Sequence, residues 1–200
     1  MQILSYHDIV IFMEIQYLHD YCLVLKGKKE QVVIDPEEKN GFEGRVVVST
    51  KNMWTFVQNS PDQLVIAGPG EYEVGGVELT GISAGQGSTV YAITIDGVSV
   101  GVMGEPIEDL TEKKIERIDS LDVLFVPCAK KSLEKLKLYL SWAKKWGVNY
   151  VIPVGYESED ELKTFLDVVD REDLLPVASL KISRDELPEG LEVVVLNRHE

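Results

Sequence analysis

Short apolar runs rich in β-branched residues fill the first half of the chain and constrain its fold most. Continuous apolar runs bounded by glycine, proline or charged residues are typical of strands that are buried on both faces. Such runs predict strands at residues 9–15, 21–25, 31–36, 46–49, 64–67, 74–82, 89–95 and 98–103, and a short helix near Met53–Gln58. Asp96-Gly97 is a dipeptide that favours a tight hairpin turn between the last two strands.

Helices and strands alternate in the second half. The pattern predicts helices over residues 109–118, 132–146 and 159–169, and strands over residues 123–127, 150–153 and 191–196. Ser132 is a helix-capping residue type and Gly147 a helix-ending one. A strand-rich half followed by alternation predicts two sheets with helices outside them. Residues 1–200 contain no linker-like stretch, so we interpret them as one domain.

Composition limits the partners that the chain can have. A net charge of −14 opposes binding to nucleic-acid backbones and to anionic membranes. No run approaches the roughly 20 apolar residues of a membrane-spanning helix. The first residues are interrupted by charge and do not resemble a signal peptide, and two unpaired cysteines favour a reducing compartment. We therefore expect a cytoplasmic protein with no nucleic-acid or membrane partner.

The histidines are too few and too scattered for a conventional zinc site. A mononuclear site needs about three nitrogen, oxygen or sulfur ligands, and a dinuclear site needs more. The chain has three histidines, His7, His19 and His199, and no two of them are spaced to share a helix or strand face. Cys22 and Cys128 form no C-x-x-C pair. The sequence therefore predicts no metal and no cofactor.

Several segments nevertheless resemble the UlaG-like branch of the metallo-β-lactamase superfamily, whose members are zinc-dependent hydrolases. The sharpest match is Gly68-Pro69-Gly70-Glu71-Tyr72-Glu73. Weaker matches are residues 6–7, 32–36, 122–127, 151–153 and 187–195. The resemblance covers nearly the whole chain. It implies an α/β fold, a four-layer αβ/βα sandwich of two mixed β-sheets with outer helices.

The chain departs from this family at every metal-ligand position. The family's His-x-His-x-Asp-His motif corresponds here to Thr50, Asn52, Trp54 and Thr55. The histidine expected after Gly81-Ile82 is absent, the family's Gly-Asp is Gly104-Glu105, and its last histidine is Gly155. The resemblance therefore implies a catalytically degenerate protein without a zinc site.

Two alternatives keep a role for the former metal cleft. In the first, Glu105 and Asp35 form an acid–base pair that acts with a hard cation or with no metal, unless these carboxylates only cap turns or pair with Lys51. In the second, the cleft binds a small ligand through polar side chains. The candidate ligand-binding residues are Thr50, Lys51, Asn52, Glu105 and Tyr156. Cys128 is expected to be an inert thiol, because no histidine is placed to activate it.

The helix predicted over residues 132–146 carries more apolar surface than one packing face needs. A first stripe comprises Leu133, Leu136, Leu140 and Ala143. A second stripe comprises Leu138, Tyr139, Trp142 and Trp146. The second stripe predicts self-association or a protein partner, because aromatic residues dominate such contacts. The alternative is that a neighbouring segment of the same chain covers it.

Overall fold

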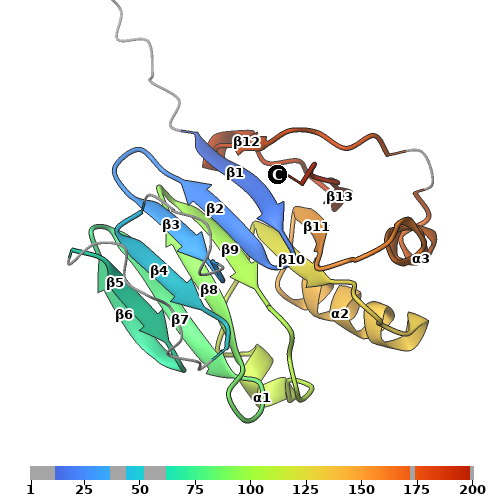
Figure 1. The fold of residues 1–200 in the computed structure, drawn as a ribbon, viewed down its shortest axis with the longest axis horizontal. Coiled ribbons are helices and arrows are strands. Elements are labelled where there is room, and N and C mark those ends of the chain that lie inside the picture. The colour runs from blue at the N-terminus through green and yellow to red at the C-terminus, as the bar shows by residue number, and fades with distance from the viewer. Residues whose placement is uncertain (1–11, 37–43, 52–61, 172–173, 199–200) are drawn as a thin grey trace, which may run out of the picture.

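Two mixed β-sheets face each other in the part of the chain that the computed structural model describes, residues 12–36, 44–51, 62–171 and 174–198 (Figure 1). The predicted fold class, two mixed sheets with helices outside them, is confirmed. The strand start predicted at residues 9–11 and the helix predicted near Met53–Gln58 lie outside the described residues, as do Asn52, Trp54 and Thr55.

The first sheet has the strand order β12-β1-β2-β3-β4-β5. Its strands are β1 (Met13–His19), β2 (Cys22–Lys26), β3 (Gln31–Ile34), β4 (Val46–Ser49), β5 (Leu64–Ala67) and β12 (Leu180–Ile182). The strands β3, β4 and β5 are parallel, and the other pairs are antiparallel. All four residues of β4 are buried, as its uninterrupted apolar run predicts.

The second sheet has the order β13-β11-β10-β9-β8-β7-β6. Its strands are β6 (Gly70–Val74), β7 (Val77–Ser83), β8 (Thr89–Ile95), β9 (Val98–Val102), β10 (Val123–Pro127), β11 (Tyr150–Val154) and β13 (Glu192–Val193). The strands β6 to β9 form an antiparallel meander, whereas β9, β10, β11 and β13 are parallel. The parallel half arises because helices connect its strands.

Helices cover the outer face of the second sheet (Figure 1). They are α1 (Glu112–Ile115), α2 (Leu133–Lys145) and α3 (Glu159–Val168), and a 3₁₀ turn follows at Arg184–Glu186. The hydroxyl of Ser132 accepts from the amide of Lys135 and caps α2. One hydrophobic core fills the space between the sheets, and a second lies between the outer helices and the second sheet. Within the described residues, no helix is long and apolar enough to cross a membrane.

Several elements differ from the sequence-based prediction. The strand predicted over residues 74–82 is β7, at Val77–Ser83, and the preceding β6, which a turn at Gly75-Gly76 joins to it, was not predicted. Helix α1 and strand β13 are shorter than the predicted segments, at Glu112–Ile115 and Glu192–Val193. Strand β12 was not predicted, because its three residues become a strand only through pairing with β1.

The predicted aromatic interface on α2 is wrong for three of its four residues. Tyr139, Trp142 and Trp146 are at most 2% exposed and pack within the outer-helix core. The indole Nε1 of Trp146 donates to the carbonyl oxygen of Ile115, 3.0 Å away, so the α1 segment lies against this stripe. Leu138 is only partly buried. A neighbouring segment of the chain therefore covers the stripe, which was the alternative prediction.

Leu133 differs from the prediction in the opposite direction. It was placed on the inward stripe of α2, yet it is 47% exposed. Leu133 is the first residue of the helix, whereas Leu136 and Ala143, further along it, are buried.

Candidate functional site

The candidate site lies where β4, β9 and β10 end. The backbone continues past β4 through Thr50 and Lys51, and the amide of Thr89 donates to the carbonyl oxygen of Thr50 over 2.8 Å. Lys51 also forms an isolated antiparallel bridge with Ser88. These contacts join the two sheets at one edge of the sandwich. Glu105 follows β9 and Lys131 follows β10 at the same place.

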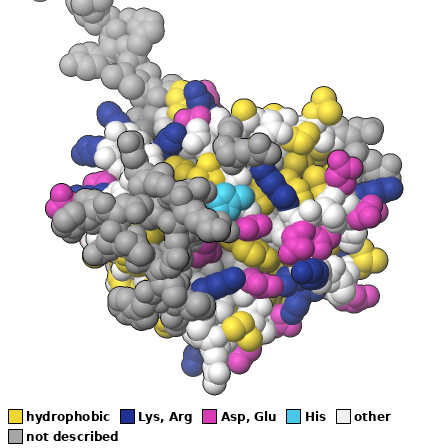
Figure 2. Space-filling model, viewed as in Figure 1, with side chains coloured by type: hydrophobic (Ala, Val, Ile, Leu, Met, Phe, Trp, Pro, Cys, Tyr) yellow, Lys and Arg dark blue, Asp and Glu magenta, His cyan; other side chains and the backbone are white. Residues whose placement is uncertain are grey.

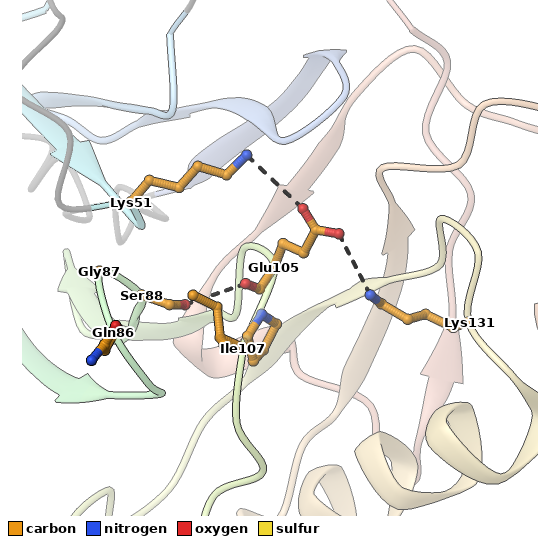
Figure 3. Close-up of a pocket in the computed structure, with 8 residues that line it drawn as sticks. Lys51, Gln86, Gly87, Ser88, Glu105, Ile107 and Lys131 are labelled. Atoms are coloured by element: carbon orange, nitrogen blue, oxygen red, sulfur yellow. Dashed lines mark hydrogen bonds and ion pairs between the residues drawn. The ribbon is translucent and has the colours of Figure 1, made fainter.

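A lysine–glutamate–lysine cluster occupies this edge (Figure 3). The Nζ of Lys51 lies 4.0 Å from Oε2 of Glu105, and the Nζ of Lys131 lies 3.7 Å from Oε1. Each carboxylate oxygen therefore faces its own ammonium group. The side chain of Lys131 is only 15% exposed, whereas those of Lys51 and Glu105 are about half exposed. A poorly hydrated ammonium needs a counter-charge, so Glu105 stabilises Lys131 in this position.

A pocket of about 420 Å³ adjoins the cluster. Its lining residues are Lys51, Gln86, Gly87, Ser88, Glu105, Pro106, Ile107 and Lys131. The hydroxyl of Ser88 donates to the carbonyl oxygen of Glu105 over 3.3 Å and ties the two lining loops together. Basic and acidic side chains are interspersed on the face drawn in Figure 2. The lining of the pocket has two lysines and one glutamate, whereas the whole chain has a net charge of −14.

Gly104 fixes the direction in which the Glu105 side chain leaves the backbone. Its φ is +56°, a conformation that favours glycine. A Cβ at this position would lie 2.1 Å from Oγ1 and 2.5 Å from Cβ of Thr50. The backbone that follows β9 therefore passes directly over the buried Thr50 side chain, and only glycine fits there.

Tyr21 fills the space beside Gly155. A Cβ on Gly155 would lie 2.5 Å from the Tyr21 ring, and the φ of Gly155 is +73°. The amide of Gly155 donates to the hydroxyl of Tyr17 over 3.0 Å, and that hydroxyl donates in turn to the carbonyl oxygen of Asp20. The ammonium of Lys51 lies 6.0 Å from the centre of the Tyr21 ring. An aromatic ring thus occupies the place that a side chain at position 155 would need.

Asp35 is bound to Thr50 rather than to the pocket. Its Oδ1 accepts from the amide of Thr50 over 2.8 Å, and its Oδ2 accepts from the Thr50 hydroxyl over 2.5 Å. Burial raises the pKa of Asp35 to about 6, although the two hydrogen bonds from Thr50 and the charge of Lys51 oppose that shift. Asp35 and Glu105 therefore engage different partners, which does not favour the predicted acid–base pair.

The raised pKa of Asp35 makes a testable contribution to stability. A carboxyl whose pKa is higher in the folded chain than its usual value of about 3.8 stabilises the fold when protonated, so this contribution falls as the pH rises from about 4 to about 6. We expect the free energy of unfolding of the wild type, relative to Asp35→Asn, to fall by about 1 kcal/mol between pH 5 and pH 7.5. Urea denaturation of both proteins at each pH measures this difference, and a relative stability that rises with pH would contradict it.

Comparison with known proteins places this chain in a family. The family model of the beta-lactamase superfamily domain matches residues 14–155. The chain belongs to this superfamily. The predicted metallo-β-lactamase membership is therefore confirmed, whereas its UlaG-like branch stays a prediction. No curated protein sequence matches the chain.

Solved structures of the superfamily share the fold. A protein from Thermotoga maritima, assigned to the zinc-dependent hydrolases of the metallo-β-lactamase superfamily, is 24% identical with a TM-score of 0.76, over 92% of this chain and 98% of that one. The metallo-β-lactamase fold protein YhfI from Bacillus subtilis is 10% identical with a TM-score of 0.62, over 95% and 98%. Igni18, a metallo hydrolase from Ignicoccus hospitalis, is 12% identical with a TM-score of 0.61, over 86% and 99%. At these identities the likeness shows the fold alone.

The described residues do not fit the metal that this superfamily implies. Among them, no group of three or more histidine, cysteine, aspartate or glutamate side chains is placed to hold an ion. The hydroxyl of Thr50 is engaged by Asp35, and Gly155 has no side chain to donate. Glu105, at the family's aspartate position, faces two ammonium groups, which repel a divalent cation.

The predicted cleft residues separate into four groups. Lys51 and Glu105 line the pocket, Thr50 lies buried below them, and Asn52 lies outside the described residues. Tyr156 does not line the pocket; its ring lies 6.2 Å from that of Tyr17 and 4.4 Å from the guanidinium carbon of Arg198.

Sequence reasoning missed Lys131 as a member of the site. The available signal was a lysine just after a buried strand in an acidic chain, at the edge where parallel strands bring loops together. Cys128, also at this strand end, is 2% exposed, and burial raises the pKa of its thiol far above the usual value. A raised pKa leaves little thiolate, which agrees with the expectation of an inert thiol.

Proposed function

We propose that this chain is a non-catalytic member of the metallo-β-lactamase superfamily whose former metal cleft binds a small molecule. The observation that carries the proposal is the cluster of Lys51, Glu105 and Lys131 beside the pocket. Two ammonium groups supply fixed positive charge at the cleft, and the one carboxylate that could hold a metal is already engaged by them. Loss of the metal therefore leaves a charged pocket rather than an empty one.

Two further contacts support the loss of hydrolysis. The Tyr21 ring fills the space beside Gly155, and the Thr50 hydroxyl donates a hydrogen bond to Asp35. Restoring a metal ligand at either position would require several residues to change together. A cytoplasmic location is part of the proposal, because the chain has only two cysteines and they lie far apart in the sequence.

Metal analysis of the purified protein tests the loss of the zinc site. We expect much less than one zinc per chain by mass spectrometry, and no turnover of lactone, phosphodiester or β-lactam substrates with or without added zinc. The reason is electrostatic: a divalent cation beside Glu105 would have to displace two ammonium groups. The Thermotoga maritima relative, purified in the same buffers, controls for metal lost during preparation.

The hydrolase alternative gives the opposite result in the same measurement. One tightly bound zinc, magnesium or manganese ion per chain, with a turnover that Glu105→Gln abolishes, would overturn the proposal. Self-association or a protein partner stays a prediction without an assigned surface, because three of the four residues on which it was placed are buried.

A further inference from the structure

We infer that the pocket binds a small organic carboxylate, and that Glu105 occupies the carboxylate position in the free protein. This inference rests on the proposed small-molecule role of the cleft and names its ligand class. In Figure 3 the Glu105 side chain points between Lys51 and Lys131, and each of its oxygens is directed at one ammonium group. The two lysines are thus arranged to hold one planar group with two oxygens.

The ion pairs of Glu105 with Lys51 and Lys131 are loose. Its contacts of 4.0 and 3.7 Å are about 1 Å longer than a tight ammonium–carboxylate hydrogen bond. The Glu105 side chain is 47% exposed, so it can rotate into solvent with little loss of buried contacts. A competing carboxylate that approaches both ammonium groups more closely would gain two charge-assisted hydrogen bonds, whereas Glu105 would regain hydration.

Two buried hydroxyl groups without partners lie near the same carboxylate. Among the described residues, the hydroxyls of Tyr21 and Tyr139 make no hydrogen bond, although both are buried. The charge of Glu105 contributes to the raised pKa of both tyrosines, after burial for Tyr21 and after burial and Asp109 for Tyr139. Neutral hydroxyl groups donate readily to an oxyanion, and an unsatisfied buried donor is costly. Neither tyrosine lines the pocket, so a bound ligand would meet Lys51 and Lys131 rather than these hydroxyl groups.

The rest of the pocket suits the apolar part of an organic acid. Pro106 and Ile107 line it, and Ile107 is 64% exposed although it is a large apolar residue. A volume of about 420 Å³ falls within the range of small-molecule sites, roughly 300–1,000 Å³. A carboxylate at the lysines would leave its hydrocarbon portion against these two side chains, which inorganic phosphate cannot use.

The acidic average of the chain does not prevent this binding. At about 0.15 M salt, charges more than about 8 Å apart are largely screened. Two lysines and one glutamate line the pocket, so its lining side chains carry a net positive charge, which increases once Glu105 is displaced or neutralised.

Titration of the full chain with benzoate at about 0.15 M salt tests the inference, with amide chemical shifts of isotope-labelled protein as the readout. We expect weak binding to the wild type, with shifts at residues 86–88, Glu105 and Ile107. Glu105→Gln should bind benzoate roughly tenfold more tightly, because the competing carboxylate is gone while the side-chain size is kept. Adding Lys131→Met to Glu105→Gln should abolish binding, and Lys51→Met should weaken it.

Matched controls exist at an exposed pair outside the pocket. Lys130 and Glu157 form an ion pair of 3.3 Å at 76% and 62% exposure, so Lys130→Met and Glu157→Gln should leave benzoate affinity unchanged. Benzamide, the neutral analogue, should not bind. Thermal melting of each variant shows that it is folded.

Four results would overturn the inference. They are no benzoate binding to folded Glu105→Gln, equal binding after Lys131→Met, equal binding of benzamide, or tighter binding of inorganic phosphate than of benzoate. Metal analysis of the same samples separates the two proposals: a stoichiometric metal refutes the proposed function, whereas a metal-free protein that ignores benzoate refutes only the ligand class.

Discussion

Trp142→Glu should lower the free energy of unfolding by about 4–5 kcal/mol. Trp142 is 2% exposed and lies between Tyr139 and Trp146, with ring centres 5.2 and 6.3 Å away. The substitution removes a large apolar side chain and places a carboxylate in a core that offers it no partner. For a chain of this length the loss corresponds to a melting temperature lower by roughly 10–15 °C. Calorimetry and light scattering of both proteins measure the effect.

The same helix provides the control. Leu133→Glu places the same charge on α2 at a position that is 47% exposed, so it should change stability by about 0.5 kcal/mol or less. A wild type that self-associates, with a Trp142→Glu variant that is monomeric and melts at an unchanged temperature, would contradict burial within the chain. That outcome would restore the interface that the sequence suggests.

The burial of Trp142 shows where helical periodicity stops being informative. Periodicity assigns residues to faces of α2, but the covering segment is a four-residue helix, α1, whose position depends on the chain between β9 and β10. The indole of Trp146 finds its acceptor at Ile115, 31 residues away. Such a contact has no local signature, so an aromatic stripe on a helix cannot be assigned to surface or core from sequence alone.

The fold is more predictable than the site because most of its strands have a signal in their own local sequence. Strands β4, β5 and β10 follow from uninterrupted apolar runs, and the turn at Asp96-Gly97 follows from residue type. Gly75-Gly76 carries a comparable hairpin signal, but the half-buried strand β6 before it has no apolar run, because exposed Glu71 and Glu73 alternate with its other residues. Strand β12 depends on pairing with β1 across most of the chain and had no local signal.

The sequence predicts which residue types lie in the cleft, but not which of them contact one another. Lys51 and Glu105 were both named as cleft candidates, yet nothing in their local sequence indicates that Lys131 completes the cluster. Parallel pairing of β9 with β10 brings Glu105 and Lys131 together across 26 positions of sequence. Likewise, Asp35 and Thr50 meet because β3 and β4 are parallel neighbours.

Gly104→Ala should lower the free energy of unfolding by about 3 kcal/mol or more. The positive φ of Gly104 costs an alanine about 1 kcal/mol. The added methyl group would also lie 2.5 Å from Cβ of Thr50, a rigid part of that side chain. Thr50 cannot retreat without stretching its hydrogen bonds to Asp35, so the β9 end and Glu105 must move instead. Urea denaturation at neutral pH measures the loss.

Gly97→Ala separates the two causes of that loss. Gly97 also has a positive φ, +80°, but an added Cβ there would meet nothing within 4 Å, so only the backbone cost of about 1 kcal/mol applies. Equal losses for the two variants would show that Thr50 does not restrain Gly104. If the losses differ as expected, Gly104→Ala should also shift the amide resonances of residues 86–88, because Ser88 is bonded to the carbonyl oxygen of Glu105. Gly97→Ala should leave those resonances in place, since Gly97 lies in the turn before β9 and not among the pocket residues.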